Sequence, residues 1–184
     1  MKRKLLLSLV CLLAVLPLAA GCRSRTDQTA GPVVLTFGQI GPVPITVSVS
    51  AADAAAGVFI PTFTIASVLK DPSGTPSPLE DVEITSYQVT YRRLDTGTRV
   101  PPPLNASLAE EVPVNGTGAI TNLPVLEINQ LMNPPLSDLV KYGYDTQTGT
   151  AVIVLNVQIQ FFGNTLSGDA VSTPVASYTM QFTP

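Results

Sequence analysis

The chain has 184 residues, with 13 acidic and 10 basic side chains, two cysteines and no histidine. The lack of histidine removes the usual general base at neutral pH, the partner that activates nucleophilic serine or cysteine, and the commonest metal ligand. The positive charge is weak and mostly scattered, which excludes nucleic acid as a partner because phosphate binding depends on clustered lysine and arginine.

The first 21 residues have the order of a secretory signal. Three basic residues at positions 2–4 precede an apolar run over 5–18, and small residues occupy 19–21. This order is typical of a segment that is removed after export. The run of 14 residues would reach about 21 Å as a helix, short of the roughly 30 Å hydrocarbon core that a spanning helix must cross. Counted on to Cys22 the run has 18 residues, so an uncleaved anchor is the alternative.

The end of this segment, Leu18-Ala19-Ala20-Gly21-Cys22, resembles the lipobox of bacterial lipoproteins. The cysteine, the preceding glycine and the apolar run match, whereas Ala19 stands where the family more often has leucine. The resemblance implies that the Cys22 thiol receives a diacylglyceryl group, that cleavage occurs just before it, and that the new N-terminus is acylated. Two or more acyl chains give stable membrane attachment. Residues 1–21 are thus the predicted signal peptide, and 22–32 are a lipidated tether.

The tether is short and polar. Residues 23–32 lack periodicity and can span at most about 35 Å, so the following domain should lie close to the membrane of the cell envelope. Arg23 follows the lipidated cysteine at a place where enterobacterial lipoproteins retained at the inner membrane tend to carry aspartate. By analogy, we expect the outer membrane rather than the inner one if the source is Gram-negative.

Export changes the composition of the remaining chain. Residues 2–4 hold three of the ten basic side chains and residues 1–21 hold no acidic one, so the net charge moves from −3 to −6. Both cysteines, Cys11 and Cys22, lie in the export segment or at its end, which leaves the domain without a disulfide. About 150 residues suffice for one core held together by burial alone.

Strand-like alternation of apolar and polar residues dominates from Val33 onward. It predicts strands over 43–49, 87–91, 157–161 and 176–182, and weaker ones over 33–37, 59–66, 118–126 and 166–172. Gly163-Asn164 is predicted as a hairpin turn. The apolar positions change from even to odd numbers between Ile84 and Tyr87, which predicts a β-bulge near Thr85-Ser86. The adjacent Arg92 and Arg93 should point to opposite faces of a strand.

Turns and one helix connect these strands. Asp71–Gly74 and Asp95–Gly97 have turn chemistry, and Pro101–Pro103 forces an extended segment. One short helix is expected, with Asn133 as N-cap, Pro134 in its first turn, and 136, 139 and 140 facing the core.

The pattern predicts an all-β fold, a single antiparallel two-sheet β-sandwich over residues 33–184 with about eight or nine strands. It resembles the immunoglobulin-like or fibronectin-like sandwiches of bacterial surface proteins. That resemblance depends on strand spacing, because the mature domain has no second cysteine and the chain has no tryptophan to form a Cys–Trp–Cys signature.

The acidic side chains give a weak metal candidate. Asp71, Glu80, Asp81 and Glu83 lie on one long connection, and calcium binds six to eight oxygen ligands. The spacing does not match an Asp-x-Asp-x-Asp-Gly loop, and a solvated acidic loop is the favoured interpretation. Glu110-Glu111 is likewise interpreted as a solvated loop. We expect no metal and no cofactor.

Tyr142 and Tyr144 are the candidate ligand-binding residues. They follow the predicted helix in Lys141–Asp145 and could stack on a sugar or anchor a protein; alternatively they fold back over the sheet edge. The expected function is a non-catalytic binding or structural module whose partners are the membrane, through lipid on Cys22, and an envelope protein or glycan. The alternatives are a carboxylate-dependent envelope enzyme and a calcium- or glycan-binding module.

Overall fold

The structure, a computed structural model, describes residues 31–41, 43 and 46–184. The predicted signal peptide, Cys22 and the tether up to residue 30 lie outside the described residues. The described strands are β1 (Val33–Ile40), β2 (Thr46–Ser48), β3 (Gly57–Leu69), β4 (Val82–Arg93), β5 (Leu104–Val112), β6 (Thr117–Glu127), β7 (Ile153–Thr165), β8 (Ala170–Ser172) and β9 (Ala176–Thr183). The described helices are α2 (Val49–Ala54), the 3₁₀ helix η1 (Pro78–Glu80), α3 (Ile128–Leu131) and α4 (Leu136–Tyr142). None of these helices is long and apolar enough to cross a bilayer.

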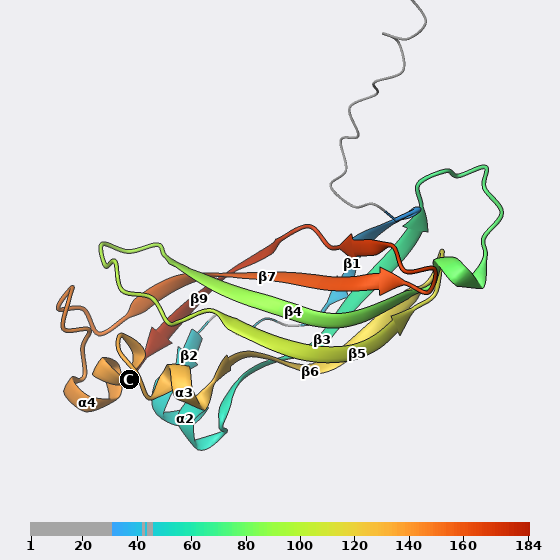
Figure 1. Ribbon diagram of the computed structural model, residues 1–184. Helices are drawn as coiled ribbons and strands as arrows, with labels where there is room; N and C mark the ends of the chain where they lie inside the picture. Colours follow the sequence, from blue (N-terminus) through green and yellow to red (C-terminus); the bar gives the residue numbers. More distant parts are fainter. Residues whose placement is uncertain (1–30, 42, 44–45) are drawn as a thin grey trace, which may run out of the picture.

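The strands form two sheets. Sheet A has the order β1-β3-β6, and sheet B has the order β2-β9-β7-β4-β5, with β8 beside β7. All pairs are antiparallel except β2 with β9, which is parallel. The long strands of sheet B curve over β3 and β6, and the helices α2, α3 and α4 gather at one end (Figure 1). The all-β class and the two-sheet arrangement are therefore confirmed.

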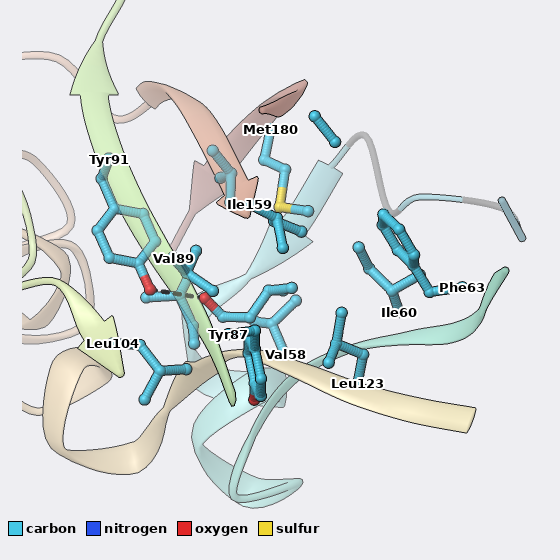
Figure 2. Close-up of a cluster of buried hydrophobic side chains, with 14 of the residues drawn as sticks. Val58, Ile60, Phe63, Tyr87, Val89, Tyr91, Leu104, Leu123, Ile159 and Met180 are labelled. Carbon is cyan, nitrogen blue, oxygen red and sulfur yellow. Dashed lines mark hydrogen bonds between the residues drawn. The ribbon is translucent and has the colours of Figure 1, made fainter. Parts of the chain in front are cut away.

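One hydrophobic core fills the space between the sheets. Its buried side chains come from alternate positions of strands in both sheets, as period-two sequences require. Figure 2 shows this meeting of layers: Val58, Ile60 and Leu123 lie on the side of sheet A, and Tyr87, Val89 and Ile159 on the side of sheet B. The alternation found in the sequence thus reports the inward faces correctly.

Three aromatic rings lie in the middle of this core, and we call Phe63, Tyr87 and Phe161 the aromatic cluster. The ring centroids of Phe63 and Phe161 are 5.0 Å apart, and those of Tyr87 and Phe161 are 5.7 Å apart. The Tyr87 hydroxyl also donates a hydrogen bond of 3.0 Å to the carbonyl oxygen of Pro124 in sheet A. The cluster therefore joins β3, β4 and β7 across the two layers.

The predicted bulge is confirmed, but the predicted hairpin turn is wrong. The register of β4 shifts between Ile84 and Ser86 against both neighbouring strands. Gly163, by contrast, lies inside β7, and the chain turns only after Thr165. A Cβ atom on Gly163 would overlap the carbonyl oxygen of Glu83. That glycine is needed for close approach of two strands at the bulge, not for a turn.

Strand β5 was not anticipated. Glu110 and Glu111 belong to it instead of to a solvated loop, and a carboxylate oxygen of Glu110 accepts a hydrogen bond of 3.0 Å from the Ala119 backbone. The alternation Leu104, Ala106, Leu108 places apolar residues inward, and Glu110 continues that face at the edge of the sheet, where its carboxylate finds a backbone donor.

The helices also differ from the prediction of a single one. Val49, expected at the end of a strand, begins α2, and α3 directly follows β6. Helix α4 lies where a helix was predicted, but its N-cap is Pro135, because the Asn133 side chain instead donates to the Asn129 carbonyl. Leu136 and Leu139 are buried as predicted, whereas Val140 is 51% exposed. It follows Leu139 by about 100° around the helix, which turns it away from the core.

Candidate functional site at the helical end

The helical end comprises α2, α3, α4 and the loop 143–150, and it lies far from the start of β1. Gly57, at the start of β3, pairs with Glu127 just before α3, whereas Leu69, at its end, pairs with Val33. The 13 residues of β3 extend about 40 Å at about 3.3 Å per residue. The helices and the start of β1 are therefore at opposite ends of the sandwich, as Figure 1 shows.

An apolar groove of about 180 Å³ opens at this end. Its lining comes from all three helices and the turn after α3: Val49, Leu131, Met132, Ser137, Val140 and Lys141. Leu131 is buried and forms the floor, whereas Met132 is 64% exposed and Val140 51%. Exposed side chains of this size that converge on one hollow are typical of a place where another molecule packs.

Tyr142 is the last residue of α4 and Tyr144 follows two residues later, and both rings are exposed. Each is 46% exposed, and their ring centroids are 6.2 Å apart. The Lys141 ammonium lies 5.0 Å from the centroid of the Tyr142 ring, a cation–π distance. Gly143 separates the two tyrosines in the left-handed region, at a φ of 79°, and its N–H closes the helix on the Leu139 carbonyl. A glycine is favoured at this position because it has no Cβ to clash.

A set of charged side chains, which we call the ionic cluster, supports this region: Arg93, Asp95, Arg99, Asp138 and Asp145. Arg93, Asp138 and Asp145 are buried, whereas Asp95 and Arg99 are partly exposed. The Arg93 guanidinium donates to Asp95 at 2.6 Å and to Asp145 at 2.9 Å. Arg99 donates from one nitrogen to Asp138 at 2.9 Å and to Asp145 at 3.1 Å. The cluster connects the end of β4 with α4 and with the loop that carries Tyr144.

Asp145 is the centre of this cluster. Its side chain is completely buried, and burial alone would raise the pKa of the carboxyl group. The hydrogen bonds from Arg93, from the Gln147 backbone and from the Thr148 hydroxyl more than compensate, and they lower the pKa of Asp145 to about 2. The pKa of Asp95 is lowered in the same way, against its own desolvation, by Arg93 and two backbone N–H groups. Both carboxylates are therefore charged at neutral pH.

The ionic cluster was not predicted from the sequence. Arg92 and Arg93 do point to opposite sides, as expected, since Arg92 is exposed and Arg93 is buried. Arg93 continues the inward register of Tyr87, Val89 and Tyr91. A charge at an inward position requires a buried partner of opposite charge. The inward position of Arg93 could therefore have predicted that an acidic side chain lies beside it.

The acidic candidates for calcium lie at the other end and make local hydrogen bonds. Asp71 accepts from the backbone and hydroxyl of Ser73, Glu80 caps η1 by accepting from the Ser77 backbone, and Asp81 accepts from the Val114 backbone. Glu83 points outward from β4. Over the residues that the structure describes, no three acidic, cysteine or histidine side chains are grouped so that they could hold a metal ion.

The comparisons with known proteins add no relative. No protein-family model, curated protein or solved structure matches the chain. The helical end combines three features: an exposed apolar groove, a pair of exposed tyrosines, and an ionic cluster that ties α4 and the loop 143–150 to the end of β4.

Proposed function

We propose that this chain is a lipid-anchored protein of the bacterial cell envelope, and that its β-domain binds another envelope protein through the helical end. The Leu18–Cys22 motif supports the anchor. The observation that carries the binding proposal is the exposed apolar groove at the end of the sandwich opposite the start of β1. An anchor on Cys22 would hold the start of β1 near the membrane and leave the groove facing away from it.

The strand order supports an immunoglobulin-like version of the sandwich. Strands β1, β3 and β6 correspond to A, B and E, and β9, β7, β4 and β5 correspond to G, F, C and C′. The parallel pair β2–β9 has the place of an additional A′ strand beside G. In antibody domains a B–F disulfide packs against a tryptophan on C. Here Phe63 on β3, Phe161 on β7 and Tyr87 on β4 occupy those strands.

The chemistry of the helical end favours a protein as the partner. Met132 and Val140 line a groove that can receive one apolar side chain, and the exposed rings of Tyr142 and Tyr144 add flat contact area at the same end of the domain. Tyrosine supplies such area at little conformational cost, and interfaces are enriched in tyrosine and methionine. A fixed surface binds more tightly than a mobile one, because less order has to be created on binding.

We propose binding and not catalysis at this site. A carboxyl group that acts as a general acid near neutral pH must have a raised pKa. At the helical end, Asp138 and Asp145 are instead paired with arginine, and the pKa of Asp145 is lowered to about 2. These two paired carboxylates are therefore suited to holding the loop 143–150 in place.

Site-specific photocrosslinking in cells tests the binding site. A benzophenone amino acid at position 142 or 132 should yield a crosslinked protein adduct, and the same group at Leu79, which is equally exposed on η1 at the opposite end, should not. A Tyr144→Ala change should weaken the crosslink from position 132. Absence of adducts from both helical-end positions would contradict the proposal.

The anchor is tested separately with Cys22→Ala. We expect wild-type protein to incorporate a palmitate analogue and to fractionate with membranes, and the variant to lose the label, because the thiol that accepts diacylglycerol is gone. Equal labelling of the two proteins would refute lipidation at Cys22. Cys11→Ala, which alters the other cysteine of the chain, is the matched control and should keep the label.

A further inference from the structure

The outer face of sheet B has an unusual composition. Successive cross-strand partners on β5, β4, β7 and β9 form rows of outward side chains, such as Ser107–Ser86–Phe162, Asn105–Gln88–Gln160 and Thr90–Gln158–Ser177. We call the residues of these rows the amide face. Every member is an uncharged polar residue except Phe162, which is 36% exposed. The face therefore combines hydrogen-bonding groups with one exposed aromatic ring.

Several of its amides are already oriented by hydrogen bonds. The Gln88 side-chain N–H donates to the Asn105 side-chain oxygen at 2.9 Å, and the Gln160 amide donates to the Thr173 carbonyl at 3.1 Å. A side-chain amide has two N–H groups and an oxygen with two lone pairs, so each retains donors or acceptors after one such bond. These amides are thus held in position while part of their capacity stays available to a ligand.

A hollow of about 210 Å³ lies on this face beside the bulge of β4. Its lining residues are Ser86, Tyr87, Gln88, Asn105, Ala106, Ser107 and Phe162, of which Tyr87 and Ala106 are on the inward face of their strands. The bulge at Thr85-Ser86 shifts the register of β4 against both β5 and β7. Bulges commonly re-aim side chains next to binding sites. Hydroxyls, amides and an aromatic ring therefore converge on one concave place.

The charges around the hollow restrict what it can accept. Glu83 and Glu111 are direct cross-strand partners, and both are exposed on the strands that border the hollow. They would repel an acidic ligand at the hollow. The three rows named above carry no lysine or arginine, and the exposed Arg92 lies in the next row along β4, paired with Asn156. A single phenylalanine also provides too little apolar area for a protein interface, whose centre is typically apolar over many side chains.

We propose that the amide face binds an uncharged polysaccharide, with Phe162 stacking on the apolar face of a sugar ring and the amides of Gln88 and Asn105 bonding to its hydroxyl groups. Neighbouring hydroxyls on a pyranose match the paired donor and acceptor of an amide, and carbon-bound hydrogens on the ring face match an aromatic surface. This site is on a sheet face, whereas the proposed protein site is at the helical end. Loss of one binding activity would therefore leave the other unaffected.

Fluorescence of a Phe162→Trp variant tests the proposal directly. The chain contains no tryptophan, so the emission of the full-length variant in detergent would come from this position alone. Laminarin, mannan, xylan, pullulan and hydroxyethyl cellulose are the neutral probes, and polygalacturonate is the acidic one. We expect at least one neutral probe to shift the emission to shorter wavelength and polygalacturonate to have no effect. Tyr142→Trp, at the helical end, is the control and should not respond.

Affinity electrophoresis of the otherwise unchanged chain provides the second measurement. The same neutral probe should retard wild-type protein, and Phe162→Ala or Gln88→Ala should weaken that retardation by about tenfold in apparent Kd. Both side chains lie on the outer face, and an unchanged thermal unfolding curve would show that the variants fold. Retardation by none of the neutral probes, retardation by polygalacturonate alone, or full retardation of both alanine variants would each overturn the proposal.

Discussion

The aromatic cluster and the ionic cluster both join parts of the domain that are distant in sequence, and they use opposite chemistry. Phe63, Tyr87 and Phe161 meet in the middle of the sandwich and exclude water from the space between the sheets. Arg93 and Asp145, also buried, meet at the helical end and place full charges out of contact with solvent. Burial of rings is favourable in itself, whereas burial of charges is favourable only while every charge has its partner.

This difference indicates that the two clusters have different structural roles. The aromatic cluster fixes how the two sheets pack, which is a property of the whole fold. The ionic cluster contributes less net free energy but determines where α4 and the loop 143–150 lie relative to β4, and so where Tyr142 and Tyr144 are presented. Variants of the two clusters should therefore differ in the size of their effect, in their dependence on pH, and in their effect on binding.

The largest loss of stability is expected for Phe161→Ala. Removing a fully buried ring between two others should lower the free energy of unfolding by about 4 kcal/mol, at all pH values, because a cavity remains that the sheets cannot close. Urea denaturation followed by circular dichroism measures it. Phe162→Ala, at the next residue on the outer face, is the matched control and should cost less than about 1 kcal/mol. Equal losses would contradict the assigned inward and outward register.

Breaking the ionic cluster should have the second largest effect. Asp145→Ala leaves the Arg93 guanidinium buried with one of its two carboxylate partners, and it should destabilise the domain by about 3 kcal/mol. Asp145→Asn preserves the shape and some hydrogen bonds and should cost less. The distinguishing measurement is crosslinking from position 142, which should decrease in Asp145→Ala even at temperatures where the domain is folded. Phe161→Ala, assayed while folded, should retain it.

Stability should depend on acid pH through the ionic cluster and not through the aromatic cluster, which has no group that titrates there. The pKa of Asp145 is about 2 in the folded protein against an ordinary value of 3.8, so its contribution is complete above pH 3.8 and is lost as the pH falls toward 2. This linkage corresponds to about 2 kcal/mol over that window. Wild-type stability, measured by urea midpoints between pH 5 and 2, should decline more steeply than that of Asp145→Asn. Identical slopes would show that Asp145 is not held in its charged form.

The smallest effect on stability is expected for the double change Tyr142→Ala, Tyr144→Ala. Both rings are about half exposed, so the free energy of unfolding should change by less than about 1 kcal/mol. Partner crosslinking from position 132 should nevertheless be lost if these rings form the contact. A melting temperature lowered as far as in Phe161→Ala would show instead that the tyrosines belong to the core.

Alternation in the sequence was sufficient to predict most of the strands, but it did not predict β5 or the groove and the ionic cluster. Alternation such as Val157, Ile159, Phe161 reports burial directly, because one face of each strand must meet the core. Strand β5 was missed because three prolines precede it and two glutamates lie near its end, which together resemble a loop. Helices α2 and α3 were missed because four to six residues are too few for a helical period to be distinguished from other patterns.

The candidate site was only partly predictable for a related reason. Tyr142 and Tyr144 were named as candidates because they were expected in a loop after the helix; Tyr142 is instead the last residue of α4, and Tyr144 does lie in the loop. The groove beside them combines residues from positions 49, 131, 132 and 140, and their proximity depends on how three connections pack at one end. The ionic cluster likewise joins residues 93, 99, 138 and 145. Local sequence gives no pairing rule for such distant side chains.

The placement of β1 has a mechanical consequence. Its first residue, Val33, pairs with the last residue of β3 at one end of the sandwich, and the helical end lies at the other. If the domain is anchored through β1 at one end and bound by a partner at the other, a pulling force between them would act parallel to its strands. Hydrogen bonds between β1 and β3 would then be loaded together in shear, not opened one after another from a hinge. The domain should consequently resist pulling along this axis far better than pulling across it.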